Sequence, residues 1–360
     1  MANIEVLFNT GRKIYENKEG LPENFGNVEK FYSEMEEYKP TSLVRLSDLA
    51  KKAGIKDICV KNESERFGLN AFKGLGVSYA LNCLMAKEKK DSYLFVSCTD
   101  GNHGRALAWR SKSLGHKCVI FMPSGSEEER VKAIEEFGAK VIVTDKNYMG
   151  AVMEAAKYAE ENGGYLVQDT YFEGYDSDVP DNIVLGYSTM VKEAIAQMEE
   201  KPTHVFVQAG VGSAAAGVIW YIRKMISEDI ITGVIEADCV ACIYESIEQG
   251  KDVAIDGIPY TVMAGLNCGE ANLKIMPLLK DSADCFIKCS DEITYKGMER
   301  ALNPVGEDEC FNSGPSGAVG LGFVEEVLTN EEFEEYRKML GFDENSVVLV
   351  FNTEGRIDTL

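Results

Sequence analysis

Short apolar runs alternate with amphipathic stretches along almost the whole chain. Runs of mainly apolar residues predict buried strands at 92–97, 117–122, 140–143, 165–167, 204–208, 233–237 and 346–351. The amphipathic stretches between them predict helices at 102–114, 127–137, 148–162, 182–198 and 213–224. Apolar strands that alternate with helices are typical of a parallel sheet covered on both faces. We therefore expect an α/β fold.

One stretch imitates a membrane span, because residues 202–222 contain no Asp, Glu, Lys or Arg. It includes His204, Gln208, Ser213 and three glycines, which suits a buried strand, a loop and a helix better. We expect no membrane segment. Residues 1–13 carry early charges and no apolar centre, so we expect no signal peptide either.

The charge balance narrows the range of partners. The chain has 360 residues, enough for about two domains. Its 59 acidic and 37 basic residues give a net charge of −22, spread along the chain. This surplus argues against nucleic acid or an anionic membrane as partner. A small anionic ligand would need a local site of backbone N–H groups.

The ten cysteines are dispersed, most of them within apolar runs. That pattern fits reduced core thiols of a cytoplasmic protein. Cys239 and Cys242 have C-x-x-C spacing, but no second pair follows at zinc spacing and the three histidines lie elsewhere. A tetrahedral zinc site needs four ligands, so we expect no metal.

Three loops with chemically distinctive residues each follow a predicted strand. They are residues 98–104, 208–214 and 352–355. Ligands of parallel sheets bind at the carboxyl ends of the strands. The glycines of the second loop, Gly210 and Gly212, could expose N–H groups to a phosphate at a helix N-terminus. They could equally form a plain tight turn, and their spacing is neither a dinucleotide fingerprint nor a P-loop.

Lys73 stands between an aromatic residue and a glycine, at the start of an apolar helix. Taken alone, it is best interpreted as a surface lysine, because lysine is almost never fully buried unless paired. A lysine whose ammonium is desolvated loses its proton readily, however, and its neutral amine can form a Schiff base.

Together these features resemble the fold-type II pyridoxal-phosphate (PLP) enzymes, the tryptophan-synthase-β and threonine-dehydratase group. That group has an early lysine, an S-x-G-N-H-like loop, a glycine-rich phosphate loop and a late Ser or Thr. All four occur here in that order, from Lys73 to Thr353. The resemblance implies two open, mostly parallel twisted sheets flanked by helices. It also implies a larger PLP-binding domain (1–91 and 173–360) and a smaller, mobile domain (92–172).

Within this group the chain is most similar to the diaminopropionate ammonia-lyases. The match covers nearly the whole chain, less well before Phe31. Two positions depart from that family: Asn267 replaces a small residue, and Gly314-Pro315 replaces Gly-Glu. The matching runs are residues 66–73, 99–105, 167–170, 173–175, 242–244, 263–270 and 316–322.

The resemblance assigns the cofactor residues. It implies that Lys73 holds PLP covalently and that Asn102 hydrogen-bonds the pyridoxal 3-oxygen. It places the phosphate on the N–H groups of Gly210, Val211, Gly212 and Ser213. Thr353 should face the pyridine nitrogen. A hydroxyl there cannot drive ring protonation as a carboxylate would, so elimination is the expected class of reaction.

The resemblance also assigns the acid–base residues. It implies that Lys73 removes the α-proton of an L-substrate, that Asp100 removes that of a D-substrate, and that Asp169 handles a β-amino leaving group. Thr99 and His103 are expected beside them, with His103 shaping the loop. From the residues alone, Asp100 could instead cap the following helix, and Asp169 could form an Asx-turn.

The activity implied is elimination of ammonia from D- or L-2,3-diaminopropionate, giving aminoacrylate and then pyruvate. A serine/threonine-type dehydratase and a non-catalytic ligand-binding relative are the alternatives. The family further suggests a cytoplasmic homodimer. Cys242 and Cys268 match paired family cysteines, which could form a disulfide or remain independent thiols.

Overall fold

The computed structural model describes residues 2–99, 101–126, 128–146, 148–171, 175, 177–255, 257 and 259–356. It divides into two compact units. Unit 1 comprises Met1–Leu21, Glu36–Phe72 and Tyr187–Leu360, and unit 2 comprises Pro22–Met35 and Lys73–Gly186.

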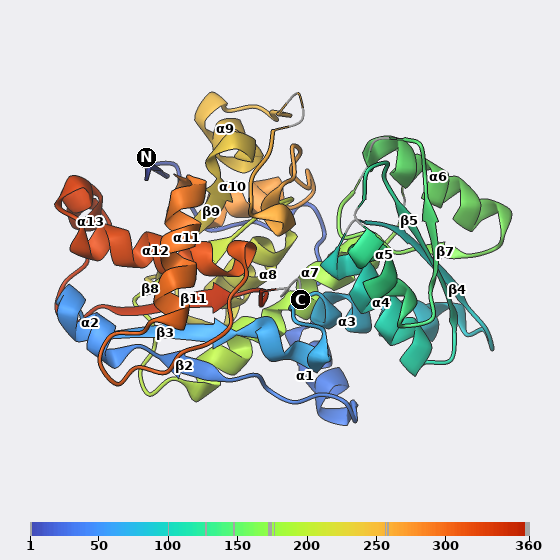
Figure 1. Ribbon diagram of the computed structural model, residues 1–360, viewed down its shortest axis with the longest axis horizontal. Helices are drawn as coiled ribbons and strands as arrows, with labels where there is room; N and C mark the ends of the chain where they lie inside the picture. The colour runs from blue at the N-terminus through green and yellow to red at the C-terminus, as the bar shows by residue number, and fades with distance from the viewer. Residues whose placement is uncertain are drawn as a thin grey trace. The chain divides into compact units, whose positions relative to one another are not determined.

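Unit 1 is built on a seven-stranded sheet in the order β1-β10-β9-β8-β11-β3-β2 (Figure 1). The two edge strands β1 and β2 are antiparallel to their neighbours, and the four pairings between them are parallel. The strands are Ile4–Phe8 (β1), Leu43–Arg45 (β2), Asp57–Asn62 (β3), His204–Gln208 (β8), Ile231–Ala237 (β9), Cys285–Cys289 (β10) and Val347–Asn352 (β11).

Helix α12 packs on this sheet through its apolar residues. Val319 and Phe323 join Phe206 and Val350 in one buried cluster, with the rings of Phe206 and Phe323 5.0 Å apart. The helices of unit 1 are Ser47–Ala53 (α2), Ser213–Tyr221 (α8), Cys242–Gln249 (α9), Met276–Ser282 (α10), Asp291–Leu302 (α11), Pro315–Thr329 (α12) and Glu334–Met339 (α13). A single π-helical turn, Ile222–Ile226, extends α8.

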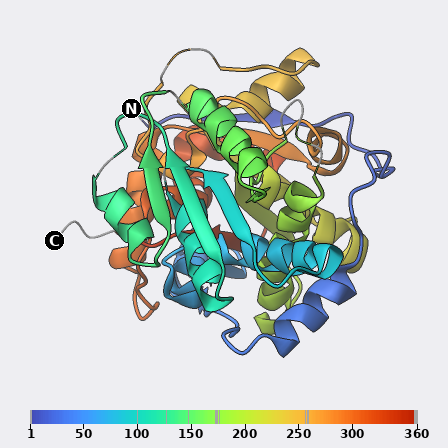
Figure 2. The same ribbon diagram turned by 90° about the vertical axis from the view of Figure 1, so that its right-hand side faces the viewer.

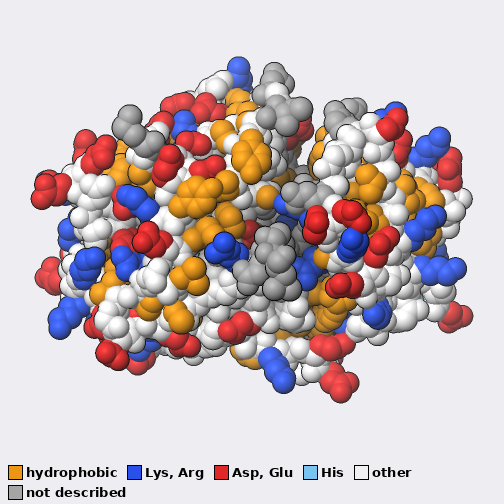
Figure 3. Space-filling model, viewed as in Figure 1, with side chains coloured by type: hydrophobic (Ala, Val, Ile, Leu, Met, Phe, Trp, Pro, Cys, Tyr) orange, Lys and Arg blue, Asp and Glu red, His pale blue; other side chains and the backbone are white. Residues whose placement is uncertain are grey.

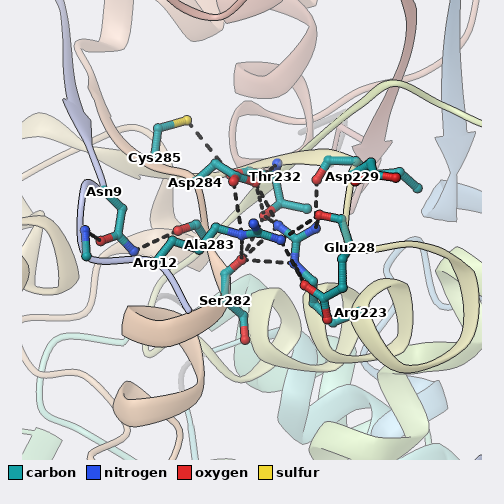
Figure 4. A network of polar contacts seen from close by, with 12 residues as sticks. Asn9, Arg12, Arg223, Glu228, Asp229, Thr232, Ser282, Ala283, Asp284 and Cys285 are labelled. Atoms are coloured by element: carbon teal, nitrogen blue, oxygen red, sulfur yellow. Dashed lines mark hydrogen bonds and ion pairs between the residues drawn. The ribbon is translucent and has the colours of Figure 1, made fainter. Parts of the chain in front are cut away.

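Two arginines anchor the N-terminal segment to the sheet (Figure 4). The side chain of Arg223 is only 4% exposed and donates to the carbonyls of Ser282 and Ile230. It also meets Asp284 Oδ2 at 2.7 Å, while Arg12 Nε meets Asp284 Oδ1 at 3.0 Å. One carboxylate therefore joins the N-terminal segment to the π-helical turn.

Unit 2 is built on a smaller, wholly parallel sheet in the order β6-β5-β4-β7 (Figure 2). Helix α6 covers one face, where Val96 and Val119 meet Ala151 and Ala155. The strands are Leu94–Cys98 (β4), Lys117–Met122 (β5), Lys140–Val143 (β6) and Tyr165–Leu166 (β7). The helices are Phe25–Glu34 (α1), Gly74–Glu88 (α3), Asn102–Ser113 (α4), Glu128–Glu135 (α5) and Tyr148–Glu161 (α6).

Every predicted strand and helix is present, and the prediction of two mostly parallel sheets is confirmed. The units differ from the expected division at 91/92 and 172/173, because the boundary falls inside helix α7, Val179–Gln197. A Cβ atom on Gly186 would lie 2.8 Å from Leu75 O, so the start of α7 packs closely on α3. Both helices therefore extend unit 2 beyond the predicted range 92–172.

The stretch 202–222 that imitates a membrane span folds as predicted, into strand β8, a loop and helix α8. Across the part of the chain that the structure describes, no helix is long and apolar enough to cross a membrane. On the face in Figure 3, acidic side chains are scattered among basic ones rather than gathered in one patch.

Candidate functional site

Lys73 is paired with Asp169 inside unit 2. Its Nζ lies 2.6 Å from Asp169 Oδ2, and the two side chains are 21% and 13% exposed. Lys73 is the N-cap residue of α3, so its side chain leaves the chain where an apolar helix begins. The structure thus contradicts the interpretation of Lys73 as a solvated surface charge.

The neighbouring Gln168 holds Asp169 in place. Gln168 is 1% exposed, and its Oε1 accepts from the N–H of Cys98 at 3.0 Å. This contact fixes the segment after β7 beside the end of β4. Burial disfavours the charged form of Asp169, but the Lys73 ammonium outweighs it, so the pKa of Asp169 lies below its usual range. Asp169 is therefore a carboxylate at neutral pH.

The loop after β4 brings Thr99 and His103 to the same region of unit 2. Thr99 is 8% exposed, and its Oγ1 accepts from the N–H of Gly101 at 3.2 Å. Gly101 is the N-cap residue of α4, and Asn102, half-buried, is the first residue of that helix. Asp100 lies outside the described residues.

His103 is buried and electrically neutral. Its Nε2 lies 2.9 Å from the carbonyl of Val167, two residues before Asp169. Because a carbonyl only accepts, Nε2 carries the proton and Nδ1 presents a lone pair. Among the described residues that Nδ1 has no hydrogen-bond partner. Burial lowers the pKa of His103, which fits a residue that shapes the loop.

The glycine loop after β8 has the geometry of an anion site. Gly212 has φ +94° and is the N-cap residue of α8, so the first N–H groups of that helix meet no side chain of their cap. A Cβ on Gly212 would lie 2.9 Å from Ile275 Cδ1, and one on Gly210 would lie 2.9 Å from Cys268 Sγ. The loop offers backbone donors without added charge, a set that fits a phosphate group.

Thr353 follows β11, the parallel neighbour of β8. It therefore lies at the carboxyl ends of the strands, as the glycine loop does. It is 4% exposed. Its hydroxyl accepts from Gln208 Nε2 at 3.0 Å and lies 3.3 Å from the carbonyl oxygen of Ser316. Sequence reasoning quoted Gln208 as part of a loop and gave it no role.

A buried cluster of four charges was also missed. Lys61, Glu63 and Arg66 are 0% exposed, although the run 61–68 looks like a polar loop. Glu193, from α7, completes the cluster, with its Oε2 2.6 Å from Lys61 Nζ and 2.8 Å from Arg66 Nη2. The partner that explains the burial is 127 residues from Arg66 and invisible in the local pattern.

The predicted residues thus fall into two groups. Unit 2 brings together Lys73, Asp169, His103 and Thr99, and unit 1 holds the glycine loop and Thr353. The ten cysteines, all among the described residues, are not joined by disulfides, and the Sγ of Cys242 lies 3.4 Å from the carbonyl oxygen of Cys268. This is the arrangement of independent thiols, the alternative to a disulfide.

Comparison with known proteins identifies the family. Residues 35–351 match a family described as pyridoxal-phosphate dependent enzyme. The diaminopropionate ammonia-lyase of Escherichia coli (strain K12) is 41% identical over 91% of this chain and 87% of its own length. That of Salmonella typhimurium (strain LT2) is 38% identical over 98% and 95%.

A solved structure supports the same assignment. Escherichia coli diaminopropionate ammonia lyase in complex with an aminoacrylate-PLP azomethine reaction intermediate matches with a TM-score of 0.91 and 39% identity. The match covers 99% of this chain and 95% of that one. The chain therefore belongs to the pyridoxal-phosphate dependent enzymes, in the group of the diaminopropionate ammonia-lyases.

Proposed function

We propose that this chain is a PLP-dependent lyase that eliminates ammonia from 2,3-diaminopropionate. The product aminoacrylate hydrolyses to pyruvate and a second ammonia. When bound, PLP supplies an electron sink that acidifies the α-proton of an amino acid and lets a β-substituent leave. The observation that carries the proposal is the Asp169 carboxylate, which already binds one primary ammonium, that of Lys73, at 2.6 Å.

The cofactor residues are assigned by their chemistry. Lys73 holds the cofactor through Nζ, and Asn102 donates to the 3-oxygen. The N–H groups of residues 210–213 bind the phosphate, which the position of Gly212 as the N-cap residue of α8 supports. Thr353 faces the ring nitrogen with a neutral hydroxyl.

Asp169 suits a substrate that carries a second ammonium. The Lys73 ammonium beside it holds the pKa of Asp169 below its usual range, and a β-ammonium in the same place would have the same effect. A hydroxyl substrate lacks a charge for this carboxylate, whereas a β-ammonium can replace that of Lys73. Asp169 then orients the β-nitrogen and keeps it protonated, so that it takes the C–N electron pair and leaves as neutral ammonia.

In this proposal a different base removes the α-proton of each isomer. Nζ of Lys73 takes the α-proton of the L-isomer, and the Asp100 carboxylate takes that of the D-isomer. Asp100 follows Thr99, whose hydroxyl accepts the N–H of Gly101. His103 and Thr99 border the substrate.

Pyruvate release from each isomer tests the assignment. The experiment compares wild type, Asp100→Asn and Asp169→Asn with D- and L-diaminopropionate. We expect Asp100→Asn to lose D-isomer turnover by ~10²–10⁴-fold, as for removal of a general base, and to retain the L-isomer. We expect Asp169→Asn to lose both.

The dehydratase alternative makes the opposite prediction. Wild-type protein that released pyruvate or its homologue from serine or threonine, but none from diaminopropionate, would overturn the proposal. A visible cofactor band that Lys73→Ala abolishes would separate an enzyme from a non-catalytic relative.

We further propose a cytoplasmic homodimer. Ten cysteines without a disulfide among them fit a reducing compartment. Unit 1 exposes large apolar side chains, among them Ile14, Met225, Tyr260 and Leu273, which a partner subunit could cover. Sedimentation equilibrium should give twice the chain mass of 39.7 kDa. A monomer at micromolar concentration would contradict the proposal.

A further inference from the structure

Gln208 lies among hydrogen-bond acceptors at the end of β8. It is 2% exposed, and its Nε2 lies 2.8 Å from the carbonyl oxygen of Ser316, 2.9 Å from that of Phe351 and 3.3 Å from that of Gly317. Thr353 Oγ1 lies 3.0 Å from the same nitrogen, whose two N–H protons these four acceptors share. Because three of these neighbours are carbonyls, which only accept, the nitrogen of the amide must face them.

The amide is locked in this orientation. Its Oε1 points toward α12, 3.9 Å from the position of a Cβ on Gly320, and has no hydrogen-bond partner among the described residues. Turning the amide over would place that oxygen against the carbonyls of Ser316 and Phe351. Toward Thr353, Gln208 can therefore act as a donor but not as an acceptor.

The proton of the Thr353 hydroxyl makes only a long hydrogen bond within the protein. A hydroxyl has one proton and two lone pairs, and Thr353 turns a lone pair, not its proton, toward the Gln208 amide nitrogen, which cannot accept. The nearest acceptor, Ser316 O, is 3.3 Å away, longer than the usual O–H···O distance of about 2.7–2.8 Å. That carbonyl already accepts from Gln208. The proton of Thr353 is thus available to a third group.

We propose that Gln208 is a positioning residue that makes Thr353 a hydrogen-bond donor to the ring nitrogen of PLP and so keeps that nitrogen unprotonated. This inference rests on the proposed placement of Thr353 at the ring. A pyridine ring without a proton on its nitrogen withdraws electrons weakly. It therefore favours rapid loss of the substituent on the β-carbon over a long-lived negative charge spread over the cofactor ring.

Loss of Gln208 should reverse the direction of the hydroxyl. Ser316 O then lacks its 2.8 Å donor, so the proton of Thr353 turns toward it. The oxygen of Thr353 presents a lone pair to the ring nitrogen, and that arrangement is favourable only when the nitrogen carries a proton.

The test uses holoenzyme loaded with PLP that carries ¹⁵N in the ring, read by NMR between pH 6 and 9. It compares wild type with Gln208→Met, Thr353→Val and a matched control, Thr294→Val. Thr294 is fully buried and donates through Oγ1 to Pro315 O, next to Ser316. The control thus removes a side-chain donor from the same end of α12 without touching Thr353.

The resonance should move in opposite directions in the two test variants. We expect Gln208→Met to shift it toward the position of a protonated pyridinium. Thr353→Val should shift it toward a neutral ring without a hydrogen bond, and Thr294→Val should leave it at the wild-type position. A Gln208→Met signal equal to wild type, with Thr353→Val shifted, would overturn this inference alone. An unshifted Thr353→Val would overturn the placement of Thr353 as well.

Neutron diffraction of the wild-type holoenzyme decides the question even where Gln208→Met does not fold. A deuteron on Thr353 Oγ1 that points to the ring nitrogen supports the proposal. A deuteron that points to Ser316 O, with the ring nitrogen deuterated, overturns it.

Discussion

Lys73 Nζ and Asp169 Oδ2 lie 2.6 Å apart, although the two residues are 96 positions apart in the chain. Each side chain is less than a quarter exposed, so the pair is only partly hydrated. The pair keeps the lysine side chain in one orientation before any cofactor is attached, and it keeps the carboxylate ionised.

Removal of the lysine charge should change how the stability of the cofactor-free protein depends on pH. The pKa of Asp169 is lowered in the folded protein, so its contribution is present above the unfolded pKa of about 3.9 and lost as pH falls through the folded pKa. In Lys73→Met, burial remains without the ammonium and the pKa of Asp169 rises. We expect this variant to lose ~2 kcal/mol at pH 7, below the ~3–5 kcal/mol of a fully buried pair.

Urea denaturation of wild type and Lys73→Met between pH 4 and 8 measures the difference in their free energies of unfolding. The gap in unfolding free energy should narrow as pH falls from 6 to 4, because the variant protonates Asp169 first. Asp169→Asn combined with Lys73→Met should remove the pH dependence of the gap. A gap that stays constant with pH would show that the ion pair is not its source.

The buried cluster around Arg66 should be essential for stability. Burial disfavours the charge of Glu193, but Arg66 and Lys61 outweigh it and its pKa is lowered. Glu193→Gln keeps the shape and leaves two buried cations with Glu63 as the remaining carboxylate of the cluster. We expect a loss of ~3–5 kcal/mol, measured as a lower urea midpoint with an unchanged slope.

Glu199→Gln is the matched control. Glu199 pairs with Arg45 and its side chain is 76% exposed, so its loss should leave the midpoint within experimental error. Equal midpoints for the two variants would show that the cluster contributes no more than a surface pair.

The pattern of apolar runs predicted the strands, but it did not predict the polar contacts of the buried side chains. Strands β5, β6 and β8 begin and end at the predicted residues, because each is an apolar run bounded by polar or turn residues. Polar side chains are a different problem. The burial of Lys61 depends on Glu193, which belongs to a helix far along the chain, and no local pattern encodes that pairing.

The site residues divide in the same way. Lys73, Thr353 and the glycine loop were predicted from motifs, because each belongs to a short run of the sequence that can be read locally. The role of Gln208 depends on three carbonyls that come together only in the fold, and no local pattern encodes that arrangement. Asp169 was found by resemblance, but its pairing with Lys73 was not.

Gly104 should be required for the position of Thr99. A Cβ at Gly104 would lie 2.6 Å from Thr99 Cγ2 and 3.1 Å from Ile134 Cδ1. Gly104→Ala must push Thr99 away from its place, at a cost of ~1–3 kcal/mol. We expect a higher KM for diaminopropionate. Gly26→Ala, in α1 with open space around it, should leave KM unchanged, and an equal KM in both variants would contradict the role of Thr99.

Gly212 allows a controlled test of phosphate binding by the glycine loop. Gly250 is its control, because alanine there causes the same backbone strain but no contact with neighbouring side chains. Both have positive φ, +94° and +69°, so alanine at either costs ~1–2 kcal/mol. A Cβ at Gly212 also meets Ile275 and Ile243 within 3.0 Å, whereas one at Gly250 meets nothing within 4 Å. Gly212→Ala should therefore weaken PLP binding by ~10-fold or more, at ~1.4 kcal/mol per tenfold. Gly250→Ala should lower Tm and leave the PLP Kd unchanged. If fluorescence titration gave wild-type affinity for Gly212→Ala, the phosphate would have to bind elsewhere.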